Sequence, residues 1–261
     1  MTDDALATRL RAAGCVFEKE EAAALRGAAR AHDELELMTS RRIAGEPLEV
    51  IVGYAEFAGL RIAVAPGVFV PRVRTELVAR LAAQLAPPSA IVVDLCCGAG
   101  AIAAAVAHAR PDLTVWAADI DPVAVALASE TLSRWGARAL VSDMDAAVPV
   151  TLRGAVSVLA ACPPYVPSAQ IALMPAEARD HEPLVALDGG ADGTAVQARV
   201  FEAAARLLAP GGVCVVETSA HLADATLAAA AAAGFTASVE RDDDLGAVVV
   251  VARRPVNVSG S

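Results

Sequence analysis

The stretch AIVVDLCCGAGAIAAAVA, residues 90–107, decides the fold of this 261-residue chain. Its first six residues are apolar except for Asp94 and pass directly into a loop with Gly98 and Gly100, and an alanine-rich segment follows. Glycine lets a ligand approach the backbone, and a helix that begins after such a loop has unpaired N–H groups in its first turn. The stretch therefore predicts a strand, a ligand-binding loop and a helix.

Strands and helices alternate on both sides of this stretch. Such alternation produces βαβ units, so we predict an α/β fold with a doubly wound, mostly parallel sheet of seven strands. The last two strands flank DDDLG (242–246) and predict a terminal hairpin. The predicted strands are 90–95, 113–120, 137–142, 155–161, 213–218, 235–241 and 246–253. The predicted helices of this region are 75–86, 99–109, 122–135, 194–209 and 221–233.

Composition and periodicity divide the chain into four parts. Residues 1–46, with helical spacing at 3–13 and 18–43, predict a short N-terminal helical domain. Residues 47–74 have β-type content throughout and predict a β-hairpin linker. The α/β domain is expected over 75–255, and 256–261 are expected to be a disordered tail. The loop from 163 to 193 is long for a compact domain, and long loops often carry function.

Composition also narrows the class of protein. The net charge is −10 and Lys19 is the only lysine, which argues against binding to a nucleic-acid backbone. No apolar run reaches the ~18 residues of a membrane span, and the acidic start MTDDALATRL has no secretory signal. We therefore expect a cytoplasmic protein that does not engage a membrane. The five cysteines form no CxxC pair, so we expect neither a metal site nor a disulfide framework.

Acidic residues at strand ends indicate the ligand. Asp119 ends the strand after the glycine loop, where a carboxylate can accept both hydroxyls of a ribose, and Asp143 follows the third strand. A dinucleotide site needs GxGxxG to seat a pyrophosphate, whereas here Asp94 precedes the turn in DLCCGAG (94–100). An acidic pocket suits a cation. The chemistry therefore favours S-adenosylmethionine, which carries a sulfonium and an ammonium and no phosphate.

Four segments together resemble one family, the HemK/PrmC-type protein-glutamine N-methyltransferases. They are RRIAGEPLEVIVGYAEFAGLRIAVAPGVFVPRVRTELV (41–78), DLCCGAGAIA (94–103), AADIDPVAVALA (117–128) and HEPLVALDGGADG (181–193). The resemblance runs from about residue 40 to 254. It implies a Rossmann-like class I methyltransferase with an antiparallel last strand, which methylates glutamine side-chain amides in peptide chain release factors. The cofactor-binding residues that it implies are Asp94, Cys96, Gly98, Gly100, Asp119, Ile120, Asp143, Met144 and Cys162. Among these, Asp94 and the glycines would line the methionine part, Asp119 the ribose and Asp143 the adenine.

The catalytic residues implied by the resemblance are Cys162, Pro163, Pro164 and Tyr165, which stand where the family has Asn-Pro-Pro-Tyr. An amide or aromatic amine is a poor nucleophile, because its lone pair is delocalised. A catalyst must hold the NH₂ in line with the departing sulfur, using two hydrogen-bond acceptors. In the family these are the asparagine oxygen and the carbonyl of the first proline, while the tyrosine ring packs on the planar group. No acid–base catalyst is required.

This sequence departs from the family pattern at two positions in the site. Sulfur is a weak acceptor, so Cys162 leaves three interpretations: methylation with Pro163 and another group sharing the NH₂ protons, a different nucleophile that needs one acceptor, or a catalytically weak relative. Cys96 replaces the first glycine usual in the loop, which a small cysteine can tolerate if φ is negative there. The helical region before Arg41 spans about forty residues, fewer than we expect for the substrate-docking helices of the family. Glu217, at a strand end, is either structural or part of the site.

The sequence thus predicts a methyltransferase that acts on a planar NH₂, most simply a protein glutamine. Three alternatives remain open: a methyltransferase of RNA or DNA base amines, whose families share a Pro-Pro-aromatic elbow, a small-molecule methyltransferase, and a cofactor-binding scaffold without turnover.

Overall fold

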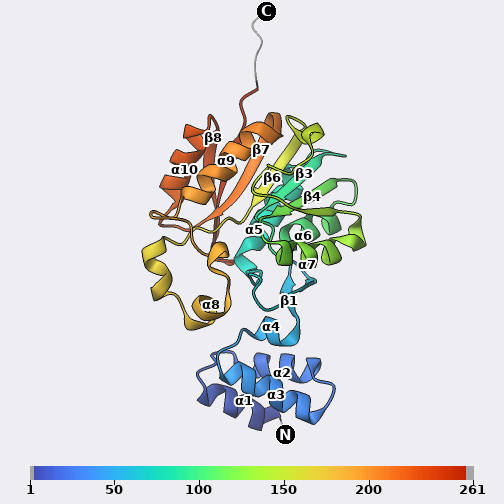
Figure 1. The fold of residues 1–261 in the computed structure, drawn as a ribbon, viewed down its shortest axis with the longest axis vertical. Coiled ribbons are helices and arrows are strands. Elements are labelled where there is room, and N and C mark those ends of the chain that lie inside the picture. Colours follow the sequence, from blue (N-terminus) through green and yellow to red (C-terminus); the bar gives the residue numbers. More distant parts are fainter. Residues whose placement is uncertain (1–2, 257–261) are drawn as a thin grey trace, which may run out of the picture.

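The main sheet has seven strands, and the computed structural model, which describes residues 3–256, orders them β5-β4-β3-β6-β7-β9-β8 (Figure 1). The strands β3 to β7 are parallel, while β9 is antiparallel to β7 and β8. The predicted sheet is confirmed, including the antiparallel last strand and the terminal hairpin. Residues 257–261 of the predicted tail lie outside the described residues. The strands are β3 Ile91–Leu95, β4 Thr114–Asp119, β5 Arg138–Val141, β6 Val156–Ala161, β7 Leu208–Thr218, β8 Thr236–Asp242 and β9 Ala247–Arg253.

Helices cover both faces of the sheet, because its central strands are apolar on both sides. In β3, Val92 belongs to the core of one face, whereas Val93 and Leu95 belong to the core of the other. The helices of the first face are α5 Glu76–Leu85, α6 Ala101–Ala109 and α7 Pro122–Leu132, and those of the second face are α9 Ala195–Leu207 and α10 Ala223–Ala232. Short 3-10 turns occur at Ser133–Trp135 and Val150–Leu152.

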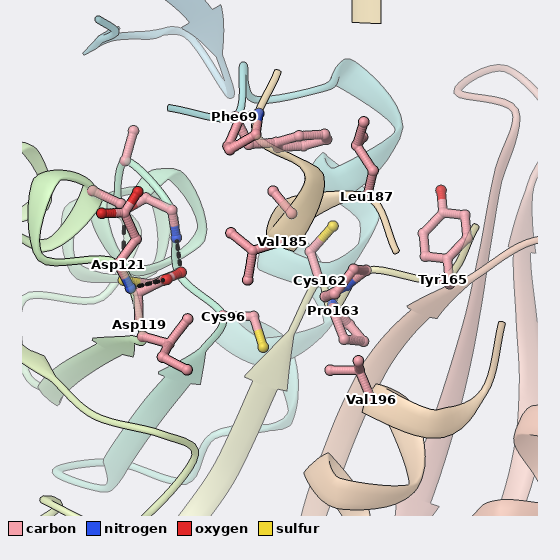
Figure 2. Close-up of a pocket in the computed structure, with 18 of the residues that line it drawn as sticks. Phe69, Cys96, Asp119, Asp121, Cys162, Pro163, Tyr165, Val185, Leu187 and Val196 are labelled. Atoms are coloured by element: carbon pink, nitrogen blue, oxygen red, sulfur yellow. Dashed lines mark hydrogen bonds between the residues drawn. The ribbon is translucent and has the colours of Figure 1, made fainter. Parts of the chain in front are cut away.

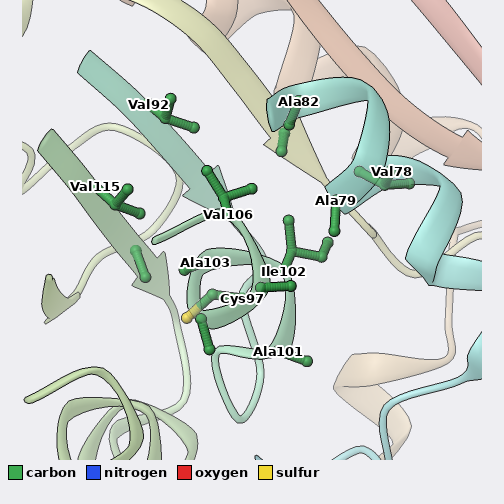
Figure 3. Close-up of a cluster of buried hydrophobic side chains, with 14 of the residues drawn as sticks. Val78, Ala79, Ala82, Val92, Cys97, Ala101, Ile102, Ala103, Val106 and Val115 are labelled. Atoms are coloured by element: carbon green, nitrogen blue, oxygen red, sulfur yellow. The ribbon is translucent and has the colours of Figure 1, made fainter. Parts of the chain in front are cut away.

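The helix α6 shows how an alanine-rich sequence packs. All seven residues from Ala101 to Ala107 are buried, and Figure 3 shows Ile102 and Val106 between the strands and α5. Small side chains let this helix lie close to its neighbours. Gly100 precedes it with a φ of +80°, and a Cβ there would lie 3.1 Å from the Cβ of Ala128 in α7. Both the conformation and the packing therefore require the second glycine of the loop.

Three helices form a separate small core at the N-terminal end, away from the sheet (Figure 1). They are α1 Asp3–Ala12, α2 Glu18–Ala28 and α3 His32–Ile43. The prediction of one helix over 18–43 is wrong, because the chain is extended at Ala31, with a φ of −146°. The Glu34 carboxylate accepts the backbone N–H of Arg30 at 2.7 Å. This break lets Leu25 and Leu35 enter the same core.

The linker begins with a helical turn where the sequence indicated β structure. Residues 48–52 form α4 (Leu48–Val52), which ends at Gly53 with a φ of +86°. Burial of Ile51 against the N-terminal helices overrides the β-propensity of this segment. The predicted hairpin follows as β1 (Tyr54–Phe57) and β2 (Leu60–Ala63).

The long loop between β6 and α9 is built from short helical turns. These are a 3-10 turn at Ser168–Leu173, α8 at Ala176–His181 and a 3-10 turn at Leu184–Ala186. In Figure 1 α8 extends from the sheet toward the N-terminal helices. There the guanidinium of Arg42 donates to Glu177 at 3.3 Å. Within residues 3–256, no helix is both long and apolar enough to cross a membrane.

Candidate functional site

A pocket opens where the carboxyl ends of β3, β4 and β6 meet the long loop (Figure 2). Figure 2 shows Asp119 and Asp121 on one side and Cys162 and Tyr165 on the other. Ligands of open α/β sheets bind at this edge of the sheet. The predicted site residues in the lining are Cys96, Gly98, Asp119, Ile120, Asp143, Met144 and Cys162 to Tyr165, while Asp94 and Gly100 are not part of it.

Two backbone N–H groups hold Asp119 at the end of β4. Gly98 donates to Oδ2 at 2.8 Å and Asp121 donates to Oδ1 at 3.0 Å. Burial raises the pKa of Asp119, while these backbone hydrogen bonds lower it. A carboxylate has about four acceptor sites. Each oxygen can therefore accept one more hydrogen bond, as a pair of neighbouring hydroxyls requires.

The loop after β3 carries a strained cysteine. Cys96 has a φ of +57°, so the condition under which a cysteine is easily tolerated there, a negative φ, is not met. The chain turns sharply out of the strand, and a left-handed conformation costs a residue with a Cβ about 1–2 kcal/mol. Part of the Cys96 side chain packs on the core beneath α9, which offsets this cost. Gly98 is also left-handed, at +52°, with nothing within 4 Å of the place a Cβ would take. Its backbone is therefore open to a ligand.

Asp94 lies behind the loop and does not reach the pocket surface. Its side chain is fully buried, and Oδ2 accepts the N–H of Ala103 in the first turn of α6 at 3.1 Å. Burial raises the pKa of Asp94 to about 8, so the carboxyl is mostly protonated at neutral pH. This hydrogen bond lets Asp94 cap the N-terminal end of α6. The predicted contact with the methionine part of a cofactor has no support in the pocket lining.

The third strand end forms the far wall of the pocket. Ile120 and Met144 supply apolar surface there, beside the exposed Asp143. Arg199 of α9 donates to Asp143 at 2.6 Å and also lines the pocket, although the sequence did not single it out. A flat heterocycle can lie against the two apolar side chains, with polar groups at its edge.

Cys162 begins the elbow, by which we mean residues 162–165. Its sulfur lies 3.9 Å from Oγ1 of Thr75, and burial raises the pKa of the thiol well above its ordinary value. A thiol that stays protonated is a poor nucleophile. Covalent catalysis by Cys162 is therefore not supported. Within residues 3–256, no group of three or more His, Cys, Asp or Glu side chains could hold a metal ion.

A glycine segment, residues 188–193, fixes the backbone of the elbow. Val166 accepts the N–H of Gly189 at 2.9 Å and donates its own N–H to Leu187 at 3.0 Å. A Cβ on Gly189 would lie 2.6 Å from the Cα of Tyr165, and a Cβ on Gly193 would lie 2.5 Å from the Tyr165 carbonyl oxygen. Only glycine permits this approach. The end of the predicted functional loop thus supports the elbow directly.

The strap, residues 70–75, crosses the elbow side of the pocket and carries two arginines. Arg72 donates to Glu182 at 2.6 Å, and Arg74 donates through Nε to Glu217 at 3.0 Å. Both glutamates are buried, and in each the second carboxylate oxygen has no partner among the described residues. The hydroxyl of Tyr165 also donates to Glu217, at 3.1 Å. Ion pairs therefore join the strap to the long loop and to β7, and a hydrogen bond joins the elbow to β7.

Comparison with known proteins identifies the relatives of this chain. The model of the methyltransferase small domain matches residues 59–177. Release factor glutamine methyltransferases of Geobacter sulfurreducens and Bifidobacterium longum are 34% and 37% identical to this chain, covering 90% and 80% of it and 79% and 76% of their own lengths. A 4-amino-L-phenylalanine/4-methylamino-L-phenylalanine methyltransferase of Streptomyces pristinaespiralis is 37% identical, over 69% of this chain and 61% of its own.

A solved structure shows the same fold. A methyltransferase from Pyrococcus furiosus superimposes with a TM-score of 0.56 at 17% identity, covering 76% of this chain and 90% of that chain. The family model and the named relatives show an enzyme of the methyltransferase class. The chain therefore belongs to the family of release factor glutamine methyltransferases.

Proposed function

We propose that this chain moves a methyl group from S-adenosylmethionine to a planar NH₂, the side-chain amide of a glutamine in a peptide chain release factor. The observation that carries the proposal is the meeting, in one pocket, of the acidic end around Asp119 with the elbow from Cys162 to Tyr165. Relatives named for this reaction resemble the chain over most of its length, which supports the same acceptor.

The residues of the acidic end fit S-adenosylmethionine. Asp119 has free lone pairs for the ribose hydroxyls, the backbone of Gly98 is open, and Ile120 and Met144 can flank the adenine. Asp121 adds a second carboxylate on this side, which suits a cationic ligand. When bound, the cofactor supplies a methyl group on a positively charged sulfur.

The elbow orients the acceptor. Two prolines fix the backbone after Cys162, so that the carbonyl groups and the ring of Tyr165 keep one arrangement. The carbonyl of Pro163 can accept one proton of the NH₂, and the apolar Val185 and Leu187 close the pocket above the elbow (Figure 2). Burial of the acceptor between these groups excludes water and aligns the nitrogen with the methyl group.

Asp119→Ala is expected to weaken cofactor binding by about 1–3 kcal/mol, the cost of losing hydrogen bonds to a charged acceptor. Calorimetry with S-adenosylmethionine and with its demethylated product measures the change. Asp112→Ala, which removes an exposed carboxylate paired with Arg110 outside the pocket lining, is the matched control and should bind as wild type does. Equal affinity in the Asp119 variant would remove the ribose assignment, and binding of NAD by the wild type would contradict the choice of S-adenosylmethionine.

Transfer itself is tested with tritium-labelled cofactor and a release-factor domain that carries a Gly-Gly-Gln loop. We expect label on the glutamine, located by mass spectrometry of the peptide. The same cofactor added to a cell lysate identifies any other acceptor. Label in nucleic acid and none in protein would contradict the proposed acceptor, as would tight cofactor binding without any transfer.

An arylamine on a small molecule is the second candidate acceptor. Cys162 favours it, because the site lacks one of the two oxygen acceptors that hold an amide NH₂, and a more reactive amine depends less on that hold. The similarity to the Streptomyces pristinaespiralis enzyme named for 4-amino-L-phenylalanine supports this class. Parallel assays with 4-amino-L-phenylalanine and the release-factor domain compare the two by kcat/KM.

Cys162→Asn is expected to raise turnover on the glutamine acceptor about tenfold, which corresponds to ~1.4 kcal/mol of transition-state stabilisation. The residue before a proline is held extended in both variants, so the new carbonyl oxygen causes no backbone strain. The hydrogen bond acts on the reacting nitrogen, so kcat should rise while cofactor affinity stays unchanged. If the wild type is the faster enzyme, Cys162 is instead adapted to the natural methyl acceptor of this enzyme.

A further inference from the structure

Glu217 is the buried carboxylate next to the elbow in the sheet. The parallel strands β6 and β7 pair Ala161 with Val216, and both of these side chains enter the core beneath α9. The next residue of each strand points to the opposite face. Cys162 and Glu217 therefore leave the sheet side by side on the face of the strap.

Two pocket-lining groups hold the Glu217 carboxylate in this position. Arg74 and the hydroxyl of Tyr165 both donate to Oε1, at 3.0 Å and 3.1 Å. The residue is fully buried, and Oε2 has no hydrogen-bond partner among the described residues. Oε1 thus accepts two hydrogen bonds, while Oε2 accepts none from the described residues.

The negative charge of Glu217 acts on both side chains of the elbow. Burial raises the pKa of the Cys162 thiol most, and the charge of Glu217 raises it further, while the hydrogen bond from Thr75 and the charge of Arg74 lower it. For Tyr165, burial and then Glu217 raise the pKa, while the charge and the hydrogen bond of Arg74 lower it. Charge acts strongly in a buried, low-dielectric place. Both elbow side chains therefore lie close to a buried anion.

This charge matters because the elbow lacks the side-chain oxygen that would accept a hydrogen bond from the NH₂. The protons of an NH₂ carry positive charge, and the sulfur of Cys162 accepts hydrogen bonds weakly. We propose that Glu217 is a positioning residue for the methyl acceptor: acting through Cys162, its charge makes the elbow negative enough to hold the NH₂ protons, in place of a side-chain carbonyl. The inference rests on the proposed transfer to a planar NH₂.

The first test measures the effect of the Glu217 charge on the Cys162 thiol, with no methyl acceptor present. Glu217→Gln removes the charge and keeps a carbonyl oxygen for Arg74 and Tyr165. Alkylation of Cys162 by iodoacetamide at pH 8, followed by peptide mass spectrometry, should become about tenfold faster, because a thiol pKa lower by one unit gives about ten times more thiolate. An unchanged rate would overturn the proposal.

Asp145→Asn is the matched control for this test. Asp145 is also a buried carboxylate held by an arginine, Arg206, at 2.6 Å and 2.9 Å, but it lies outside the pocket lining. Its loss should leave Cys162 alkylation and methyl transfer within about twofold of wild type, since it contributes no charge at the elbow. Equal acceleration in both variants would show loosening of the fold, and would count against a specific role.

The second test measures turnover at saturating cofactor in four proteins: wild type, Glu217→Gln, Cys162→Asn and the double variant. Glu217→Gln should lower kcat about thirtyfold in the wild type with unchanged cofactor affinity. In the Cys162→Asn background the same change should cost about threefold or less, because the asparagine oxygen now holds the NH₂. Equal losses in the two backgrounds would show that Glu217 only supports the fold.

The outcomes separate this inference from the proposed function. If wild type transfers no methyl group to the release-factor domain, the proposed acceptor is wrong, while the alkylation rates still decide whether Glu217 sets the potential at Cys162. If Glu217→Gln does not fold, Arg74→Gln gives the opposite test. Removing the guanidinium takes away the positive charge that opposes Glu217, so alkylation of Cys162 should slow severalfold. A faster or unchanged rate there would also overturn the proposal.

Discussion

Gly189→Ala is expected to abolish methyl transfer and to lower the free energy of unfolding by about 3 kcal/mol. A Cβ at this position would lie 2.6 Å from the Cα of Tyr165, 2.7 Å from the carbonyl oxygen of Gly193 and 2.9 Å from its Cα. All three are backbone atoms, so no side-chain rotation relieves the overlap. The glycine segment must move away from the elbow, and the NH₂ of the methyl acceptor is then no longer aligned with the methyl group. Urea unfolding and the tritium assay measure the two effects.

Gly27→Ala is the control for this substitution. Gly27 is exposed in α2, and nothing lies within 4 Å of its added Cβ. Alanine favours a helix over glycine, so this variant should be about 0.5–1 kcal/mol more stable and fully active. If Gly189→Ala folds and turns over like the wild type, the packing of the glycine segment on the elbow does not govern the reaction.

Tyr165→Ala is expected to lower kcat about a hundredfold, the scale of losing the orientation of a reacting group. The ring lines the pocket beside the elbow, and its hydroxyl is fixed on Glu217 at 3.1 Å. Removal leaves a space where the acceptor can turn away from the methyl group. Cofactor affinity should remain within about twofold, because Asp119 lies at the other end of the pocket.

Tyr54→Ala provides the comparison for this loss. Tyr54 lies in the hairpin, with Arg61 over its ring at 4.4 Å, outside the pocket lining. Its replacement should leave kcat unchanged. A Tyr165→Ala enzyme that keeps wild-type kcat on every acceptor that the wild type methylates would place the reacting centre away from the elbow.

Local patterns in the sequence predicted the sheet well, because its central strands are buried on both faces and read as continuous apolar runs. The prediction of one helix over 18–43 and the β-type content expected at 48–52 failed for one reason. Burial of Leu25, Leu35 and Ile51 in a shared core decides both segments, and that core brings together residues distant in sequence. Tertiary packing overrides local propensity in such places.

The residues of the candidate site also fall into those that the sequence indicated and those that it did not. Asp119 and the elbow could be predicted because each stands in a short motif whose residue types fit the chemistry. The pair of Arg74 with Glu217 spans 143 positions, so no local pattern indicates it. The left-handed Cys96 was missed because a residue with a Cβ normally avoids that conformation, and only the tight turn after β3 imposes it.

The ion pair of Arg42 with Glu177 ties helix α3 to helix α8, whose loop continues into the glycine segment beside the elbow. Such a tie has a thermodynamic consequence. If a partner seated on the N-terminal helices and the ligands of the pocket favour the same arrangement of this loop, each must raise the affinity for the other by the same factor. The gain in partner affinity when the pocket is filled and the gain in ligand affinity when the partner is bound are then two measurements of one coupling constant.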